Sequence, residues 1–235
     1  GLGSSYLHEA GKDEGIKALR AAVNGGINYF DLAAGHGASF PIYGEALKEY
    51  RSRIFYQIHF GADYTKGDYG WSLDLDTIRH SVEWMLKELR TDYIDYGFIH
   101  CQDEFSDWES YQANGVYDYI LKLKEQGIVR HIGLSSHTPK VINRILDEAE
   151  VDMLMFSVNP AYDYGHGEYA YGEVEERERI YRRCETEGIG ISVMKPFSGG
   201  QLLESRNGYH YEAENLQGYP GGVGAVINEE AVLAG

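Results

Sequence analysis

The fold is decided by residues 27–47, which read INYFDLAAGHGASFPIYGEAL. The apolar run 27–30 predicts a buried strand, and the strand ends on the carboxylate of Asp31. A loop of small residues that carries His36 comes next, and a helix is expected to begin near residue 43. A strand that stops on an acid before a glycine-rich loop is typical of the carboxyl edge of a parallel sheet, where such folds hold their chemistry. Taken alone, Asp31 is equally well explained as a turn or cap residue.

The rest of the chain repeats a pattern in which a helix ends at a glycine and an apolar strand follows at once. It occurs at Gly25-Gly26, at Gly127 and at Gly188, and such short connections are typical of repeated β/α units. The expected helices lie at 13–24, 45–50, 74–89, 117–125, 139–150 and 173–187. The expected strands lie at 27–30, 53–60, 93–100, 128–134, 151–158 and 189–194, after the end of a first strand at 1–5.

These alternating elements predict an α/β fold, a parallel (β/α)8 barrel of the triosephosphate-isomerase type. A doubly wound sheet is the alternative, but no dinucleotide glycine fingerprint follows the first strand. We expect the barrel to be incomplete at its C-terminal end, because 221–227 is a weak candidate for an eighth strand and 229–234 is only a stub of helix. Residues 1–235 are expected to form a single domain that becomes atypical from about residue 202.

Composition argues against several classes of partner. The formal net charge of −16 disfavours nucleic acid and anionic membrane surfaces. Neither a signal-peptide pattern nor an apolar stretch long enough to span a bilayer is expected. The two cysteines, Cys101 and Cys184, make no disulfide framework. We therefore expect a cytoplasmic protein without a nucleic-acid or membrane partner, while the 20 tyrosines indicate no site by their number alone.

Side chains capable of chemistry stand at the ends of three consecutive expected strands. They are Asp31, His59 and His100, and His36 lies in the loop just above. Because the carboxyl ends of parallel strands converge on one mouth, we expect these side chains to meet there. A single histidine at a strand end is usually structural, so the alternatives are that His59 points outwards and that His100 bonds only to backbone.

Several segments also resemble the aldo-keto reductase family. The run DLAAGHG at 31–37, followed by GEAL at 44–47, is similar to the signature in which tyrosine and glycine stand five and six residues after an aspartate. The segment 91–100 looks like that family's strand with its active-site histidine. The segment 127–136 looks like the one whose last polar residues hold the nicotinamide amide. Finally, 190–200 resembles the bacterial branch that often carries a ferredoxin-like tail.

The resemblance covers about residues 1–203 and implies an NAD(P)H-dependent oxidoreductase that reduces an aldehyde or ketone. It implies NADP or NAD as the cofactor and a small carbonyl compound as the substrate. The cofactor-binding residues that it implies are Ser135 and Ser136 for the amide, with Met194, Phe197, Ser198, Gly199 and Gly200 for the ring and the pyrophosphate.

The chain departs from the family's catalytic set of Asp, Tyr, Lys and His. Asp31 and His100 are retained, whereas His36 takes the tyrosine position and His59 the lysine position. Histidine can also donate a proton, with an ordinary pKa near ~6.5 in place of ~10 for tyrosine. The resemblance therefore implies Asp31, His36, His59 and His100 as the catalytic residues, with His36 as the proton donor.

Two other functions stay open at this stage. The same four side chains are good ligands for zinc, and a metal held at a barrel mouth would activate water as in a hydrolase. Alternatively, the barrel has lost catalysis. The family's glutamine and stacking tyrosine at the nicotinamide correspond here to Met155 and Met194, and no counterpart of the loop that grips the adenosine phosphate is recognisable after Gln201. We therefore expect cofactor binding to be weaker than is usual for the family.

Overall fold

The computed structural model describes residues 1–197, except 6, 34, 160–161 and 163–170. Within this part of the chain, seven parallel strands form one curled sheet, in the order β1-β2-β3-β6-β7-β8-β9. They are β1 (Leu2–Gly3), β2 (Tyr29–Asp31), β3 (Phe55–Phe60), β6 (Ile94–Ile99), β7 (Val129–Ser135), β8 (Met153–Ser157) and β9 (Gly190–Met194). The predicted parallel α/β architecture is confirmed as a half-barrel. The eighth strand and last helix expected at 221–227 and 229–234 lie outside the described residues.

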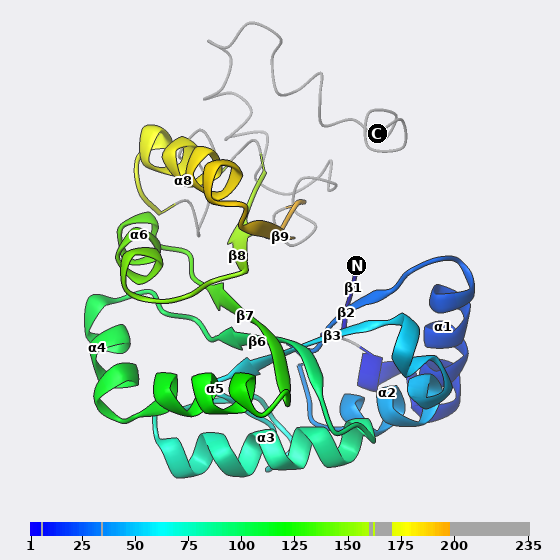
Figure 1. Ribbon diagram of the computed structural model, residues 1–235. Helices are drawn as coiled ribbons and strands as arrows, with labels where there is room; N and C mark the ends of the chain where they lie inside the picture. The colour runs from blue at the N-terminus through cyan, green and yellow to red at the C-terminus, as the bar shows by residue number, and fades with distance from the viewer. Residues whose placement is uncertain (6, 34, 160–161, 163–170, 198–235) are drawn as a thin grey trace, which may run out of the picture.

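Helices cover the outer, convex side of this sheet (Figure 1). They are α1 (Lys12–Asn24), α2 (Ser39–Leu47), α3 (Leu75–Leu89), α4 (Phe105–Ala113), α5 (Val116–Glu125), α6 (Pro139–Glu148) and α8 (Val174–Glu187), with the short 3-10 helices η1 (Leu7–Ala10) and η2 (Lys48–Arg53). In the part of the chain that the structure describes, none of the helices is both long and apolar enough to cross a membrane.

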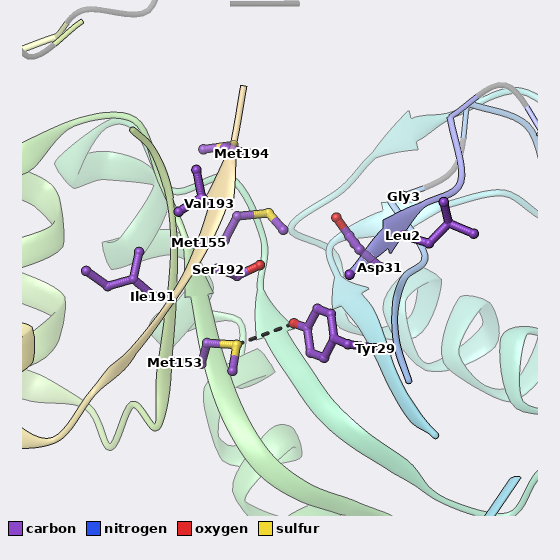
Figure 2. Close-up of a pocket in the computed structure, with 11 residues that line it drawn as sticks. Leu2, Gly3, Tyr29, Asp31, Met153, Met155, Ile191, Ser192, Val193 and Met194 are labelled. Atoms are coloured by element: carbon purple, nitrogen blue, oxygen red, sulfur yellow. Dashed lines mark hydrogen bonds between the residues drawn. The ribbon is translucent and has the colours of Figure 1, made fainter. Parts of the chain in front are cut away.

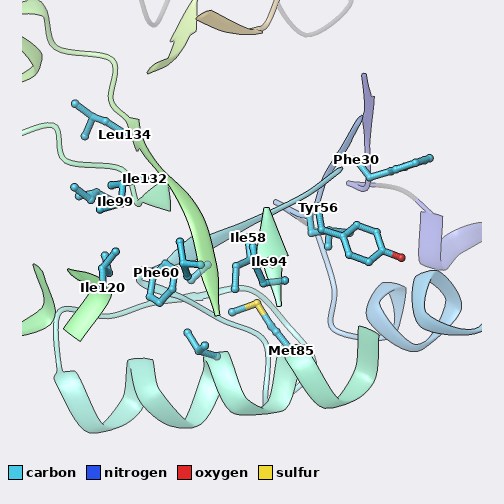
Figure 3. Packing of buried hydrophobic residues seen from close by; sticks show 14 of the residues in the cluster. Phe30, Tyr56, Ile58, Phe60, Met85, Ile94, Ile99, Ile120, Ile132 and Leu134 are labelled. Carbon is cyan, nitrogen blue, oxygen red and sulfur yellow. The ribbon is translucent and has the colours of Figure 1, made fainter. Parts of the chain in front are cut away.

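The hydrophobic core lies between the sheet and the helices. Side chains alternate between the two faces of a strand, so Tyr56, Ile58 and Phe60 of β3 share the outer face. Figure 3 shows this layer packed against α3, which contributes Met85. The register of β3 with β6 pairs Gln57 with Tyr96 and His59 with Phe98, which sets these side chains on the concave inner face. The residues that carry chemistry therefore face the inside of the half-barrel.

Two helices differ from the sequence-based expectation. The helix expected from about residue 45 begins at Ser39, because its first turn already buries Phe40 and Ile42. Pro41 is tolerated there, since a proline in the first helical turn loses no hydrogen bond. Helix α4 was not expected, although it buries Trp108 and begins with a reciprocal capping box at Glu104.

A small hairpin follows the end of β3, near the carboxyl ends of the strands. Strand β4 (Ala62–Asp63) pairs antiparallel with β5 (Gly70–Trp71) within the segment that was expected to be a loop. The backbone of His36 bridges to Asp68 in the hairpin turn. This bridge joins the loop after β2 to the hairpin after β3.

Candidate active site

The strand ends of β2, β3 and β6 hold a line of hydrogen-bonded side chains, which we call the histidine relay: Asp31, His59, His100 and Tyr69. Oδ1 of Asp31 lies 3.0 Å from Nε2 of His59. Nδ1 of His59 lies 2.9 Å from Nδ1 of His100, and Nε2 of His100 lies 2.8 Å from the hydroxyl of Tyr69. The expectation that Asp31, His59 and His100 meet at one mouth is therefore met, and Tyr69 extends their line.

The relay runs from a buried interior to the surface. His59 is 1% exposed, whereas Tyr69 is 46% exposed at the rim. Burial, with a further contribution from the charge of His59, holds the pKa of His100 well below its usual range, so His100 stays neutral. Burial likewise raises the pKa of Tyr69 to about 12, with a smaller contribution from Cys101, so its phenol keeps its proton.

Polar side chains also line the inner face beneath the relay. Nε2 of Gln57 lies 3.1 Å from Oδ1 of Asp31 and 2.9 Å from Nε2 of His59. The hydroxyl of Tyr29 donates to Oε1, the side-chain amide oxygen of Gln57, and lies 3.3 Å from the sulfur of Met153. A typical barrel fills its interior with branched apolar residues, so this layer is unusually polar.

A cavity of about 480 Å³ opens between β1–β2 on one side and β8–β9 on the other. Figure 2 shows Tyr29 and Asp31 facing Met153, Met155 and Ser192 across it. Met194 also lines the cavity, at the end of β9. Its volume suits a small organic group, and it reaches the relay through Asp31.

The contacts that the structure gives for His36 lie outside the histidine relay. Its ring stacks on His8 with centroids 5.1 Å apart, and its Nδ1 accepts a hydrogen bond from the amide of Ala38 at 3.0 Å. The structure thus brings together three of the four residues expected to be catalytic and places the ring of His36 between His8 of η1 and the amide of Ala38 in its own loop. The assignment of His36 as proton donor stays a prediction.

A second polar group, which we call the Asp103 cluster, lies at the ends of β6, β7 and β9: Cys101, Asp103, Ser136, His137 and Lys195. Asp103 accepts hydrogen bonds from the amide of His137 at 2.6 Å and from its Nδ1 at 2.9 Å. Nζ of Lys195 lies 2.9 Å from Nε2 of His137. Among the described residues, the group whose metal-ligating atoms lie within 4.8 Å of one another is Cys101, Asp103 and His137, a different set from the one expected from sequence.

The described residues expected to bind a cofactor fall in two places. Ser135 and Ser136 are both buried at the end of β7, where the Ser135 hydroxyl accepts from the amide of Cys101 at 2.8 Å. The Ser136 hydroxyl donates to Asp103 at 3.2 Å. Phe197 is exposed just after β9, while Ser198, Gly199 and Gly200 lie outside the described residues.

Tyr69 is the relay member that sequence reasoning missed. It stands in a stretch rich in Gly, Tyr and Asp with no usable periodicity, and it is one of 20 tyrosines. Pairing of β4 with β5 folds the hairpin so that Tyr69 lies over the strand ends, next to His100. Sequence spacing does not encode this contact, because the two residues are 31 positions apart on different elements.

Known proteins are similar to this chain in sequence and in fold. It is 28% identical over 224 residues to the oxidoreductase YqkF of Bacillus subtilis, covering 92% of this chain and 70% of that protein. It is 25% identical over 207 residues to the L-galactose dehydrogenase of Arabidopsis thaliana, covering 86% of this chain and 61% of that enzyme. The chain therefore spans only part of the length of these relatives.

Solved structures agree on the architecture. An aldo-keto reductase of Bacillus halodurans in its holo form superposes with a TM-score of 0.68 at 24% identity, over 88% of this chain and 65% of that one. An aldo/keto reductase of Klebsiella pneumoniae in complex with NADP and acetate gives 0.63 at 18% identity, over 92% and 70%. The model of the Aldo/keto reductase family matches residues 1–221. This chain is therefore a member of the aldo/keto reductase family.

Proposed function

We propose that the protein is an NAD(P)H-dependent oxidoreductase that reduces an aldehyde or ketone at the mouth of the half-barrel. The observation that carries this proposal is the hydrogen-bonded line of Asp31, His59 and His100 at adjacent strand ends. Barrel enzymes carry their chemistry at this end of the strands. A line of groups that exchange protons suits a reaction in which a carbonyl oxygen must gain one. Membership of a family of carbonyl reductases supports the same reaction.

The residues present fit a nicotinamide ring in part. Met155 and Met194 give the cavity a soft apolar wall, which accepts a flat ring without an aromatic partner. The Ser135 hydroxyl accepts from the amide of Cys101 and lies 3.4 Å from Nδ1 of His100, so its hydrogen is available to a carboxamide oxygen when Nδ1 of His100 carries a proton. The Ser136 hydroxyl donates to Asp103 and accepts from the backbone amide of Thr138. Its hydrogen is therefore not available to the carboxamide of a nicotinamide. When bound, the reduced cofactor would supply the hydride, held by Met155, Met194 and Ser135.

The chain's own residues would hold the carbonyl and supply its proton. His100 is neutral, and its two ring nitrogens contact His59 and Tyr69, so it would pass a proton along the line and would not contact the carbonyl itself. Oδ1 of Asp31 lies 3.0 Å from Nε2 of His59, so the two form an ion pair when the ring carries both of its protons. A charged His59 paired with Asp31 would take the part that lysine plays in the family's catalytic set, as the cation behind the proton donor.

The metal-site alternative finds less support in the same contacts. The facing atoms of Asp31, His59 and His100 are hydrogen-bonded to one another, and a bound ion would have to displace those protons. In the Asp103 cluster, Lys195 faces one nitrogen of His137 and Asp103 faces the other, so the ring is engaged on both sides. Burial also raises the pKa of the Cys101 thiol to about 12, which disfavours the thiolate that a metal binds.

Turnover of a reduced cofactor tests the proposal. The purified chain is mixed with NADPH or NADH and a panel of aldehydes and ketones, and cofactor oxidation is followed by absorbance, with metal content measured on the same sample. We expect carbonyl-dependent oxidation of one cofactor, unchanged by a chelator. Cofactor that binds without turnover with any carbonyl would favour a non-catalytic barrel. Stoichiometric zinc with no cofactor binding would favour the metal site.

A further inference from the structure

We propose that Tyr69 is the group that hands the proton to the carbonyl oxygen, and that His59, paired with Asp31, supplies that proton through His100. This inference rests on the proposed function. It assigns a catalytic role to a side chain on the hairpin after β3, while the family resemblance places the donor in the loop after β2, at His36. Tyr69 is the rim end of the relay, where a substrate arriving from solvent would meet it.

The hairpin holds Tyr69 in place from several sides. Its ring lies 5.8 Å from the buried ring of Tyr64 and 5.9 Å from the ring of His100. The amide of Gly37 donates to the carbonyl of Gly67 at 2.6 Å, which ties the turn to the loop after β2. Asp63 caps the same turn by accepting from the amide of Thr65 at 3.0 Å. The phenol is therefore pre-positioned over the strand ends, as catalysis by proton transfer requires.

When His59 is neutral, one arrangement gives each contact of the relay a donor and an acceptor. In it, the amide nitrogen of Gln57 donates to Asp31 at 3.1 Å and not to Nε2 of His59, which lies 2.9 Å away. A carboxylate can only accept, so the 3.0 Å contact with Asp31 requires a proton on Nε2 of His59. Nδ1 of His59 then accepts from Nδ1–H of His100, and Nε2 of His100 accepts from the hydroxyl of Tyr69. Every donor points towards Asp31 in this state. The Tyr69 proton is engaged with His100, and its oxygen is free to accept from an alcohol.

Protonation of His59 reverses the outer part of this chain. A charged His59 donates from Nε2 to Asp31 and from Nδ1 to His100, so His100 must carry its proton on Nε2 and donate to Tyr69. The hydroxyl hydrogen of Tyr69 is then free for a carbonyl oxygen. The titratable groups that face the two rings are Asp31, Tyr69 and, at longer range, Asp103 and His137. Two uncharged groups also face them, with Gln57 lying 2.9 Å from His59 and Ser135 lying 3.4 Å from His100. Only the charged state of His59 is competent for reduction.

During reduction of the carbonyl, one proton would move along the relay from His59 to the substrate oxygen. When bound, the reduced nicotinamide would supply a hydride to the carbonyl carbon. The π electron pair would move to the oxygen, which would take the proton of Tyr69. The phenol oxygen takes the Nε2 proton of His100, whose Nδ1 takes the Nδ1 proton of His59. The products are an alcohol, an oxidised nicotinamide and a neutral His59 that still donates to Asp31. His59 regains its proton from water along the same line, through the exposed Tyr69.

The test compares three variants with the wild type in reductive kcat and KM. Tyr69→Phe keeps the ring and removes the hydroxyl, and we expect kcat to fall by at least ~10²-fold with little change in the KM for the cofactor. Tyr119→Phe removes a half-buried hydroxyl from α5, on the other side of the sheet, and is the matched control. His36→Gln tests the donor that the family resemblance implies. A fully active Tyr69→Phe would overturn the inference, as would a loss of turnover confined to His36→Gln.

A second readout does not depend on turnover. The imidazole ¹⁵N shifts of His100 report which ring nitrogen carries the proton and whether the other accepts a hydrogen bond. We expect Tyr69→Phe to move the Nε2 signal of His100, and Tyr119→Phe to leave it in place. An unmoved Nε2 signal would show that Tyr69 does not end the relay. If the wild type turns over no carbonyl while the shift does move, the proposed function has failed together with the donor role that rests on it, although the contact itself exists.

Discussion

The two faces of β3 are buried to the same degree, but one packs against helices and the other forms a hydrogen-bonded network. Tyr56, Ile58 and Phe60 on the outer face and Gln57 and His59 on the inner face are all at most 1% exposed. The outer side chains pack on helices in an apolar layer (Figure 3). The inner ones satisfy their polar atoms within the concave side, through Tyr29, Asp31 and His100. Burial alone therefore does not distinguish a core position from a site position.

The contrast has a thermodynamic reason. An apolar side chain stabilises the fold by the area that it removes from water, about 25 cal/mol per Å². A buried polar group lowers stability unless each of its donors and acceptors is paired. A polar network on the inner face is therefore tolerated only when every donor in it has an acceptor. We therefore expect changes on the outer face to alter the free energy of unfolding, and changes on the inner face to alter proton transfer.

The largest effect is expected from Asp31→Asn on the inner face. Asparagine still accepts from Nε2 of His59 but carries no charge, so the protonated form of His59 loses its counter-ion. Reductive kcat/KM should fall by ~10²-fold or more, a loss comparable to that of a general acid. Thermal unfolding should confirm that the variant remains folded.

The matched control for that variant is Asp103→Asn, which removes a carboxylate from the same mouth outside the relay. Its effect on kcat/KM should stay below ~10-fold, as expected for a charge that acts only at longer range. Equal losses in the two variants would mean that the overall charge of the mouth, and not the relay, controls the reaction.

The next effect is expected from Ile58→Ala on the outer face. Ile58 is fully buried in the core cluster, so truncation should lower the free energy of unfolding by about 2–5 kcal/mol. Urea denaturation measures this loss, and kcat/KM of the folded fraction should stay within about threefold of the wild type. If Ile58→Ala instead abolished turnover in a folded sample, the division of roles between the faces would be wrong.

The smallest effect is a pH dependence of stability from His100. Burial lowers the pKa of folded His100 below its unfolded value of about 6.5, so the unfolded state binds a proton more readily. Its contribution is complete above about pH 6.5 and is lost as the pH falls from there towards the lower folded pKa. His100→Gln should flatten the stability profile between about pH 7 and 5.

His80, which is exposed in α3, provides the control for this profile. Replacing it by Gln removes a histidine outside the relay and is the matched variant. A slope that persists in His100→Gln and disappears in His80→Gln would contradict the assignment of the pH dependence to the inner face.

Strand positions could be predicted from the sequence because each strand is a dense apolar run after a helix stop. The expected strand 53–60 became Phe55–Phe60, and 128–134 became Val129–Ser135. Helix α4 was missed because its buried aromatic residues, Trp108 and Tyr111, are too few to make a convincing period. The pairing of Glu104 with Asp107 was the available signal, since reciprocal capping marks a helix start.

The candidate site could be predicted only where strand ends define it. Asp31, His59 and His100 stand at such ends, so parallel pairing brings them together. Tyr69 depends on a hairpin of two-residue strands, which leaves no periodic signal in the sequence. The contacts of His36 could not be predicted, because spacing along the chain does not determine where its ring points, and its role as proton donor stays a prediction.

The most direct test of the central claim is the pH dependence of wild-type turnover in both directions, measured with one carbonyl and its alcohol. Reduction requires the charged state of His59, and oxidation requires the neutral state. As the pH rises, we predict that kcat/KM for reduction falls while kcat/KM for alcohol oxidation rises. Flat profiles in both directions, or profiles that move together, would contradict a relay that supplies and recovers the proton.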